Sequence, residues 1–323
     1  MSNSQSFSNC TADTIREAAA ALKAGHLVAF PTETVYGLGA DARNPEAVKR
    51  IYEVKGRPSD HPLIVHISSI SQIEKWAREI PEYAIDLARA FWPGPMTLIL
   101  KRTEIVRDFI TGGQETVGLR VPSDPIALAL IQEFERISDS AIVAPSANRF
   151  GQVSPTSSAD VQEELGQFLL PEDTILNGGT SIVGIESTII SCTSSMPKIL
   201  RPGAVLIEQV ESLLKTKLSS ENLGDPIRFS GSFEKHYAPK TKVMLNAVPN
   251  PGNGLIALSE FETPNGVLRL ASPQTATEFA KELYSALREA DRLGLNEVVV
   301  KLPENKGIGI AIIDRLMKAS QGR

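Results

Sequence analysis

The sequence predicts an α/β fold with two domains of unequal size. Short apolar segments alternate with amphipathic segments along most of the chain, which is the pattern of strands connected by helices. Hydrophobic residues make up 42% of the 323 residues and charged residues 22%, so most of the chain can bury a globular core. At about 150 residues per domain, a chain of this length is expected to form two domains.

The first helix and the first strand are predicted near the N-terminus. Thr14 and Glu17 have the spacing of a capping box, so we expect a helix that begins here and ends near Gly25. Residues 26–30 (HLVAF) then form an apolar segment that predicts a buried strand, and this strand stops at Pro31.

A second helix is predicted between Asn44 and Gly56. Asn44 followed by Pro45 is typical of an N-cap and the first helical position, and Gly56 ends the helix just after Lys55. The alternation continues after this helix. Strands are expected at 62–67, 96–101, 116–121, 141–145 and 187–191, and helices at 71–78, 81–91, 124–136, 158–166 and 206–218.

A change in composition divides the chain near residues 219–241. This segment has almost no apolar periodicity and contains glycine, proline and serine, so we interpret it as a linker. The sequence therefore predicts a larger domain over 11–218, a linker over 219–241 and a small α/β domain over 242–323. Within the small domain we expect three short strands, a helix at 276–293, a strand at 297–301 and a last helix from about residue 309.

Composition excludes several classes of protein. Cys10 and Cys192 are far apart and form no CxxC pair, which argues against a disulfide scaffold and a structural zinc site. The formal net charge of −5 argues against a protein whose main task is to bind the nucleic-acid backbone. The first ten residues do not resemble a signal peptide, and no segment approaches the ~20 apolar residues of a membrane span. We expect a soluble, cytoplasmic protein.

One short motif suggests a dinucleotide site. Residues 37–42 (GLGADA) match the GxGxxG/A fingerprint, and Asp60 follows about 20 residues later. In a dinucleotide-binding fold the helix begins at these glycines, whereas here the helix is predicted to begin at Pro45. A nicotinamide or flavin site is therefore the less favoured interpretation. The sequence also contains no GxxxxGK[ST], GxSxG or HExxH motif.

Polar residues gather just after several predicted strands and helices. The segment 31–37 (PTETVYG) offers hydroxyls and a carboxylate at the end of a buried strand, where ligands of α/β proteins usually bind. Lys55 at the end of the second helix and Arg57 just after it precede His61, and two cations held in fixed positions suit a polyphosphate. Two simpler interpretations stay open: threonines chosen for β propensity, and cations that complement a helix C-terminus.

Two further strands end in polar residues. Arg120 ends the segment TVGLR and can bind a carboxylate through two hydrogen bonds, although an ordinary surface ion pair explains it equally well. Ser146 and Asn148 follow the segment AIVA, and they can either face a shared cavity or form capping and Asx-turn hydrogen bonds. Together, these cations, hydroxyls and amide favour an enzyme that uses ATP or another nucleotide.

The chain resembles the YrdC-like family. The segments that support this resemblance are, in order, PTETVYGLGADA, KGRPSDHPLIVHI, WPGPMTLIL, VGLRVP, APSANRFGQVSPT, GIESTI and RPG. The segment 230–240 (SGSFEKHYAPK) and the C-terminal unit resemble the long, two-domain form of the family. The resemblance extends from about residue 11 to the end, and it implies a twisted mixed sheet with helices around a concave active site, followed by a small Rossmann-like domain.

The resemblance also implies a reaction. Members of this family join L-threonine, bicarbonate (or carbon dioxide) and ATP into L-threonylcarbamoyl-adenylate and release pyrophosphate, so we expect a nucleotidyltransferase. A separate tRNA threonylcarbamoyl transferase complex is the expected partner, because it places the activated group on an adenosine next to the anticodon. Magnesium is expected to arrive with ATP, since no dedicated carboxylate cage is visible in the sequence.

By resemblance, thirteen residues form the site, and the sequence matches the family at each of them. The catalytic set KxR…SxN falls on Lys55, Arg57, Ser146 and Asn148; the positions that hold L-threonine are Thr34, His66, Arg120, Ser146 and Ser187; the positions around ATP are Arg57, His61, Thr116, Asn148, Thr156, Arg201 and Tyr237.

The linker and two rival functions complete the expectations. Residues 230–239 contain glycine and serine before Tyr237 and proline after it, which predicts a lid that closes over bound nucleotide. A weak RNA-binding module is one rival, because the YrdC-like fold is associated with a concave basic surface. The other is a relative that uses carbamoyl phosphate, but such relatives are much longer and have zinc-finger cysteines, whereas this chain has two cysteines.

Overall fold

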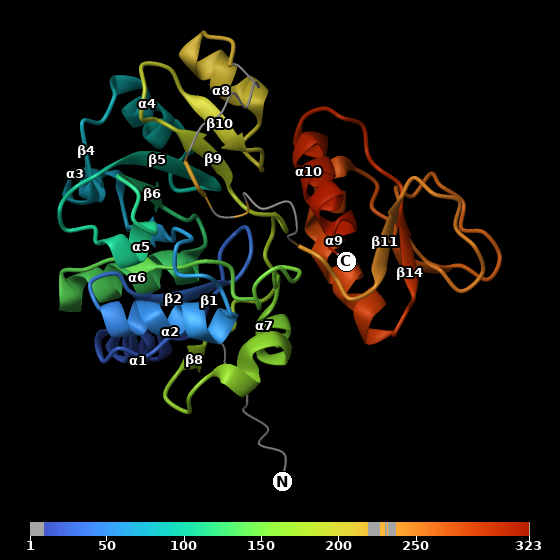
Figure 1. Ribbon diagram of the computed structural model, residues 1–323, viewed down its shortest axis with the longest axis horizontal. Helices are drawn as coiled ribbons and strands as arrows, with labels where there is room; N and C mark the ends of the chain where they lie inside the picture. Colours follow the sequence, from blue (N-terminus) through green and yellow to red (C-terminus); the bar gives the residue numbers. More distant parts are fainter. Residues whose placement is uncertain (1–9, 219–226, 230, 232–236, 323) are drawn as a thin grey trace.

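Ten strands of the larger domain pair in one mixed sheet (Figure 1). The computed structural model describes residues 10–218, 227–229, 231 and 237–322. The strands are β1 (Val28–Phe30), β2 (Gly37–Asp41), β3 (Ile64–His66), β4 (Ala77–Arg78), β5 (Met96–Arg102), β6 (Thr116–Arg120), β7 (Ile142–Val143), β8 (Thr174–Ile175), β9 (Thr188–Ser191) and β10 (Lys198–Arg201). Their order is β10-β9-β5-β6-β3-β7-β2-β1-β8, and β4 pairs with β5.

Helices pack against both faces of this sheet. They are α1 (Ala12–Lys23), α2 (Pro45–Lys55), α3 (Ile73–Trp76), α4 (Glu82–Phe91), α5 (Asp108–Thr111), α6 (Pro125–Ser138), α7 (Ser158–Leu165) and α8 (Ile207–Leu214), with short 3₁₀ turns at Ile70–Gln72 and Gly166–Phe168. Phe30 of β1 packs in a core with α1 and α6. Its neighbour Ala29 packs in a second core with α2. Because side chains alternate along a strand, these two cores lie on opposite faces.

The N-terminal helix begins earlier than predicted. Its N-cap is Thr11, whose hydroxyl accepts a hydrogen bond from the backbone N–H of Thr14. The Thr14 hydroxyl in turn accepts from the backbone N–H of Thr11 at 2.7 Å, so the reciprocal capping box uses this pair. The predicted box of Thr14 with Glu17 is wrong, because a threonine three residues after the cap can replace glutamate in this role.

The second helix begins and ends as predicted. The side chain of Asn44 accepts hydrogen bonds from the backbone N–H groups of Glu46 and Ala47, and Pro45 is the first helical residue. The helix ends at Gly56, whose φ of 61° lies in the left-handed region that glycine adopts without strain. This sharp end directs the chain toward Arg57.

The glycines of the dinucleotide-like motif lie in a strand. Gly37 and Gly39 belong to β2, which the sequence pattern did not predict, and α2 begins only at Pro45. A Cβ atom on Gly39 would lie 2.9 Å from both the ring of Phe30 and the side chain of Ile142. The glycine therefore allows close packing within the sheet, which accounts for the motif without a phosphate.

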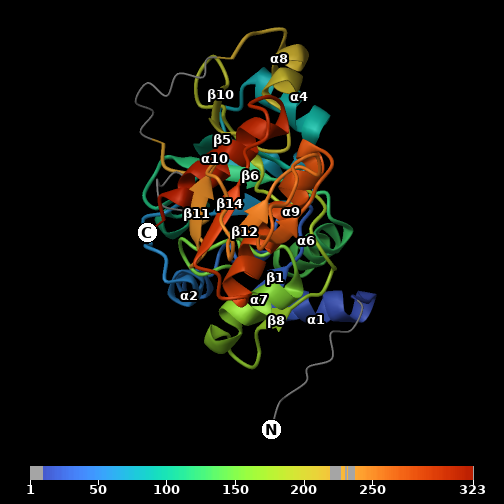
Figure 2. The same ribbon diagram turned by 90° about the vertical axis from the view of Figure 1, so that its right-hand side faces the viewer.

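The C-terminal strands form a separate parallel sheet. They are β11 (Lys242–Leu245), β12 (Gly254–Ile256), β13 (Leu268–Ala271) and β14 (Glu297–Val300), in the order β11-β14-β12-β13. The helices α9 (Ala276–Arg292) and α10 (Ile308–Ser320) lie between this sheet and the larger domain (Figure 1), and Figure 2 shows the small domain from its outer side. The elements expected at 276–293, 297–301 and from about 309 correspond to α9, β14 and α10.

The two sheets agree with the expected α/β class. The predicted bounds 11–218, 219–241 and 242–323 stay a prediction, because residues 219–226 lie outside the described residues. Most of the predicted lid, 230 and 232–236, also lies outside them. Across the described ranges, no helix is long and apolar enough to cross a membrane.

Candidate functional site

A buried cavity brings together most of the predicted site residues. Its walls come from the loop after β1, the strands β3 and β6, the loop after β7 and the segment before β9. Eight of the thirteen predicted residues line it: Thr34, Arg57, His66, Arg120, Ser146, Ser187, Arg201 and Tyr237. The other five, Lys55, His61, Thr116, Asn148 and Thr156, do not line it but lie in segments that lead to it.

The cavity lies over a face of the sheet. Polar residues were predicted at the ends of strands, and His66 and Arg120 do lie side by side at the ends of the parallel strands β3 and β6. However, β7 runs antiparallel to β3, so Ser146 approaches from the opposite end. Ile64 and His66, two residues apart on β3, both line the cavity, which places it over the face to which both side chains point.

Arg120 is held in a fixed position in this cavity. Its Nη2 donates a hydrogen bond to the carboxylate of Glu33 at 2.7 Å and another to the hydroxyl of Thr34 at 2.9 Å. The second oxygen of Glu33 accepts from the backbone N–H of Ser123 at 3.1 Å. The Nε of Arg120 is buried and has no hydrogen-bond partner among the described residues. A fixed guanidinium with a remaining donor suits a ligand carboxylate.

His66 lies beside this arginine and is neutral. Burial, and then the nearby charge of Arg120, lower the pKa of His66 to about 3. Its Nδ1 lies 3.2 Å from the carbonyl oxygen of Ile64. At neutral pH the imidazole therefore adds a hydrogen-bonding group to the cavity without adding a second positive charge next to Arg120.

Two more arginines line the cavity. Burial lowers the pKa of Arg57 to about 10, so Arg57 remains protonated at neutral pH. Burial also lowers the pKa of Arg201. Arg57 donates to the carbonyl of Pro62 at 3.0 Å, and Arg201 donates to the carbonyl of Ser187 at 2.9 Å. Backbone contacts thus orient both guanidinium groups in a cavity suited to an anionic ligand.

Lys55 lies beneath the loop after β7. Its Nζ donates hydrogen bonds to the backbone carbonyls of Ser146 and Asn148, and only 2% of the residue is exposed. Burial, followed by the charge of Arg57, lowers the pKa of Lys55 well below its ordinary value. In this structure the lysine supports the loop that lines the cavity, and a direct contact with phosphate stays a prediction.

The remaining predicted residues belong to the surrounding loops. Asn148 donates from Nδ2 to the carbonyls of Arg149 and Gln152, which shapes the loop after β7. Thr156 follows in the same connection, and its backbone N–H donates to the carboxylate of Asp160 at 3.2 Å. The ring of His61 lies 5.2 Å from that of Phe150, and Thr116 begins β6. Their contacts with ATP stay predictions.

Sequence reasoning missed two charged residues at this site. Glu186 lines the cavity and is buried, and Arg315 of α10 forms an ion pair with it at 2.8 Å. A local signal existed for Arg315, which shares the apolar face of its helix with Ala311 and Ile312. A cation on such a face is usually buried and paired, although its partner in the other domain could not be named.

Comparisons with known families show which family the chain belongs to. A family model described as telomere recombination, which unites Sua5, YciO and YrdC, matches residues 20–203. A second model, described as the C-terminal domain of threonylcarbamoyl-AMP synthase, matches residues 205–321. The chain belongs to the Sua5/YrdC family. It has the two-domain form of this family, as the sequence resemblance implied.

Similar proteins agree over nearly the whole length. The threonylcarbamoyl-AMP synthase of Pyrococcus abyssi is 42% identical over 325 residues, which cover 95% of this chain and 94% of that protein. The threonylcarbamoyl-AMP synthase of Bacillus subtilis is 40% identical, with 96% and 93% covered. The crystal structure of P. abyssi Sua5 complexed with L-threonine superposes with a TM-score of 0.86 at 39% identity, over 98% of this chain and 96% of that one.

Proposed function

We propose that this chain joins L-threonine, bicarbonate and ATP into L-threonylcarbamoyl-adenylate and releases pyrophosphate. The observation that carries the proposal is the guanidinium of Arg120, fixed by Glu33 and Thr34 in a cavity that Arg57 and Arg201 also line. Such a cavity offers separate positive groups for a carboxylate and for phosphates. The Sua5 structure with L-threonine and the names of the relatives support the same reaction.

At the amino-acid end, Arg120 binds the carboxylate of L-threonine. Thr34, His66 and Ser187 line the cavity around it and offer hydroxyl and imidazole groups to the rest of the amino acid. The amine remains available. Bicarbonate loses hydroxide to give carbon dioxide, and the amine adds to this carbon and loses a proton, so a carbamate and one water molecule are formed. His66 is neutral, so it does not repel the positive charge of Arg120, which binds the carboxylate of L-threonine during this step.

At the nucleotide end, the carbamate oxygen attacks the α-phosphorus of ATP and pyrophosphate leaves. Arg57 and Arg201 stabilise the charge that develops on phosphate oxygens, an effect worth about 3–4 kcal/mol per well-placed donor. Lys55 supports the loop that presents Ser146. Asn148, His61, Thr116, Thr156 and Tyr237 complete the proposed nucleotide contacts. Positioning and electrostatics suffice for this chemistry, so no covalent enzyme intermediate is required.

The product is a mixed anhydride that water destroys, which favours a closed site. The lining residues Thr34, His66, Arg120, Ser187 and Arg201 are all buried. The cavity is therefore sheltered by protein on the side where the anhydride forms, which fits a reaction that must exclude water.

Magnesium enters the proposal as part of the substrate Mg·ATP. Across the described ranges there is no group of three or more His, Cys, Asp or Glu side chains that could hold a metal ion. The one carboxylate lining the cavity in these ranges, Glu186, accepts hydrogen bonds from Ser154, Tyr284 and Arg315. We propose phosphate oxygens and water as the ligands of this magnesium.

A second enzyme uses the product. A tRNA threonylcarbamoyl transferase complex is the proposed partner, because the activated group must reach an adenosine of tRNA, and we place the reaction in the cytoplasm with ATP and tRNA. The rival function, weak RNA binding by this chain itself, would give duplex-RNA affinity at physiological salt without pyrophosphate release.

The test is pyrophosphate release with L-threonine, bicarbonate and ATP, each omitted in turn. We expect release only when all three are present. An Arg120→Met variant is expected to lose the response to L-threonine, since it removes the proposed carboxylate contact. Release that does not depend on L-threonine would overturn the proposed function.

A further inference from the structure

The carboxylate of Glu186 connects the cavity with the small domain. It lies between Ile185 and Ser187 just before β9, and it is buried. One of its oxygens accepts from the hydroxyl of Ser154 at 2.6 Å, and the other accepts from the hydroxyl of Tyr284 at 2.9 Å and from Nε of Arg315 at 2.8 Å. Two of these three donors belong to the C-terminal domain.

Arg315 contacts the cavity wall at more than one point. It has no exposed surface, and its Nη2 donates to the carbonyl of Pro202, the residue that follows Arg201, at 3.0 Å. Its guanidinium carbon lies 5.3 Å from the centre of the Tyr237 ring, and that ring stacks on Tyr284 at 5.8 Å. One arginine of α10 therefore contacts Glu186, Tyr237 and the chain next to Arg201.

The charge of Glu186 follows from its burial and from the two arginines near it. Burial alone would raise the pKa of Glu186, but the charges of Arg315 and Arg201 outweigh it and lower the pKa to about 2. Glu186 is therefore negative at neutral pH, although it lines a cavity that is proposed to bind a triphosphate. A buried charge requires a partner. Of the two arginines that act on Glu186, only Arg201 lines the cavity itself.

We propose that Arg315 is a positioning residue for the active site: it neutralises and holds Glu186, so that the cation of Arg201 serves ATP rather than this carboxylate. The inference rests on the proposed function, because it takes ATP as the ligand near Arg201. It gives the C-terminal domain a defined part in the reaction. Without Arg315, the negative charge of Glu186 opposes the phosphates and attracts Arg201.

The test compares three variants for the KM of ATP in pyrophosphate release and for the Kd of ATP by calorimetry. Arg315→Gln is expected to raise both constants at least tenfold, while the KM of L-threonine changes less than threefold. Glu186→Gln in the same chain removes the uncompensated carboxylate at the cavity, whereas Asp314, which also pairs with Arg315, keeps its ion pair with Lys318. The double variant is therefore expected to recover most of the affinity for ATP. A role in packing alone would make the double variant as weak as R315Q or weaker.

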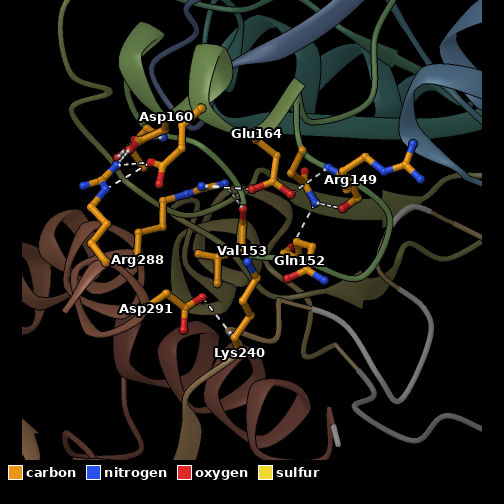
Figure 3. A network of polar contacts seen from close by, with 12 residues as sticks. Arg149, Gln152, Val153, Asp160, Glu164, Lys240, Arg288 and Asp291 are labelled. Atoms are coloured by element: carbon orange, nitrogen blue, oxygen red, sulfur yellow. Dashed lines mark hydrogen bonds and ion pairs between the residues drawn. The ribbon is translucent and has the colours of Figure 1, made fainter. Parts of the chain in front are cut away.

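Arg288 offers a matched control at the same domain interface. It extends from α9 and, as Figure 3 shows, donates to the carboxylate of Glu164 and to the backbone carbonyl of Val153. Neither partner lines the cavity. Arg288→Gln is therefore expected to lower the melting temperature while the KM of ATP stays within twofold of the unmodified chain.

The outcomes distinguish the proposed role of Arg315 from the proposed function of the chain. Recovery of ATP affinity in E186Q/R315Q, with little change in R288Q, would support the role of Arg315. No recovery in the double variant, or an equal loss of affinity in R288Q, would overturn it. Failure of the proposed function is a different result, since the unmodified chain would then release pyrophosphate without L-threonine or not at all.

Discussion

The guanidinium of Arg120, which lines the cavity, and the carboxylate of Glu33, which lies behind it, form a buried ion pair at 2.7 Å. The side chains of both residues are less than a tenth exposed, so water does not compensate either charge. The residue proposed to bind L-threonine is thus oriented before the ligand arrives. This pair explains why the predicted binding segment 31–37 contains a glutamate.

The first prediction concerns this pair. Glu33→Gln is expected to lower the free energy of unfolding by about 3 kcal/mol, because it leaves a buried arginine without its counter-charge. Chemical denaturation followed by circular dichroism measures this change. Glu79→Gln is the matched control: Glu79 is about half exposed where it pairs with Lys101, so its substitution is expected to change the free energy of unfolding much less than E33Q does. Equal stability of E33Q and the unmodified chain would contradict the prediction.

The second prediction concerns Lys55. Lys55→Met is expected to lower both turnover and the free energy of unfolding, because the buried carbonyls of Ser146 and Asn148 lose their donor. Each buried acceptor without a partner costs about 1–3 kcal/mol. If Lys55 acted only on phosphate, the variant would lose activity and keep its stability. Parallel denaturation and pyrophosphate assays separate these outcomes, and Arg57→Met provides the comparison for an arginine that lines the cavity.

Local signals in the sequence sufficed for part of the fold and of the site. The cap at Asn44 and the left-handed end at Gly56 depend on neighbouring residues only, so the helix that leads to Arg57 could be predicted. His66 and Arg120 end two apolar segments, and the structure pairs those strands in parallel. The resemblance to a family then supplied residues, such as Ser187 and Arg201, that no local pattern singled out.

The features that the sequence did not predict depend on contacts between distant segments. Strand direction cannot be determined from an apolar segment, so the antiparallel β7 and the position of the cavity over the sheet face were not predicted. Glu186 and Arg315 are 129 residues apart in the chain and meet only because the two domains pack together. The strand at 37–41 was missed because glycines disfavour strands, and the packing of Phe30 against Gly39 overrides that preference.

The third prediction concerns Tyr237. Its ring is buried between Tyr284 and Arg315 and also lines the cavity. Tyr237→Ala is expected to lower kcat at least about tenfold, a barrier change of roughly 1.4 kcal/mol, because it removes these contacts beside the nucleotide end. Tyr237→Phe retains the ring and is expected to keep most of the turnover. Turnover in Y237A at the level of the unmodified chain would show that the ring is dispensable.

The fourth prediction follows from His66. Its pKa of about 3 in the folded chain lies below the ordinary value of 6.5, so the unfolded chain binds more protons between these values. The contribution of the neutral imidazole to stability is therefore fully present above pH 6.5 and is lost as the pH falls toward 3. For this one group the loss between pH 7 and pH 5 is about 2 kcal/mol.

His66→Asn removes this titration and leaves the other groups in place. We expect the free energy of unfolding of the variant to fall less steeply between pH 7 and pH 5 than that of the unmodified chain, by about 2 kcal/mol over the interval. Urea denaturation at several pH values measures the two slopes, and because every other titrating group occurs in both chains, their contributions cancel in the difference. Parallel slopes would mean that His66 binds its proton alike in the folded and unfolded chains, and they would contradict the lowered pKa.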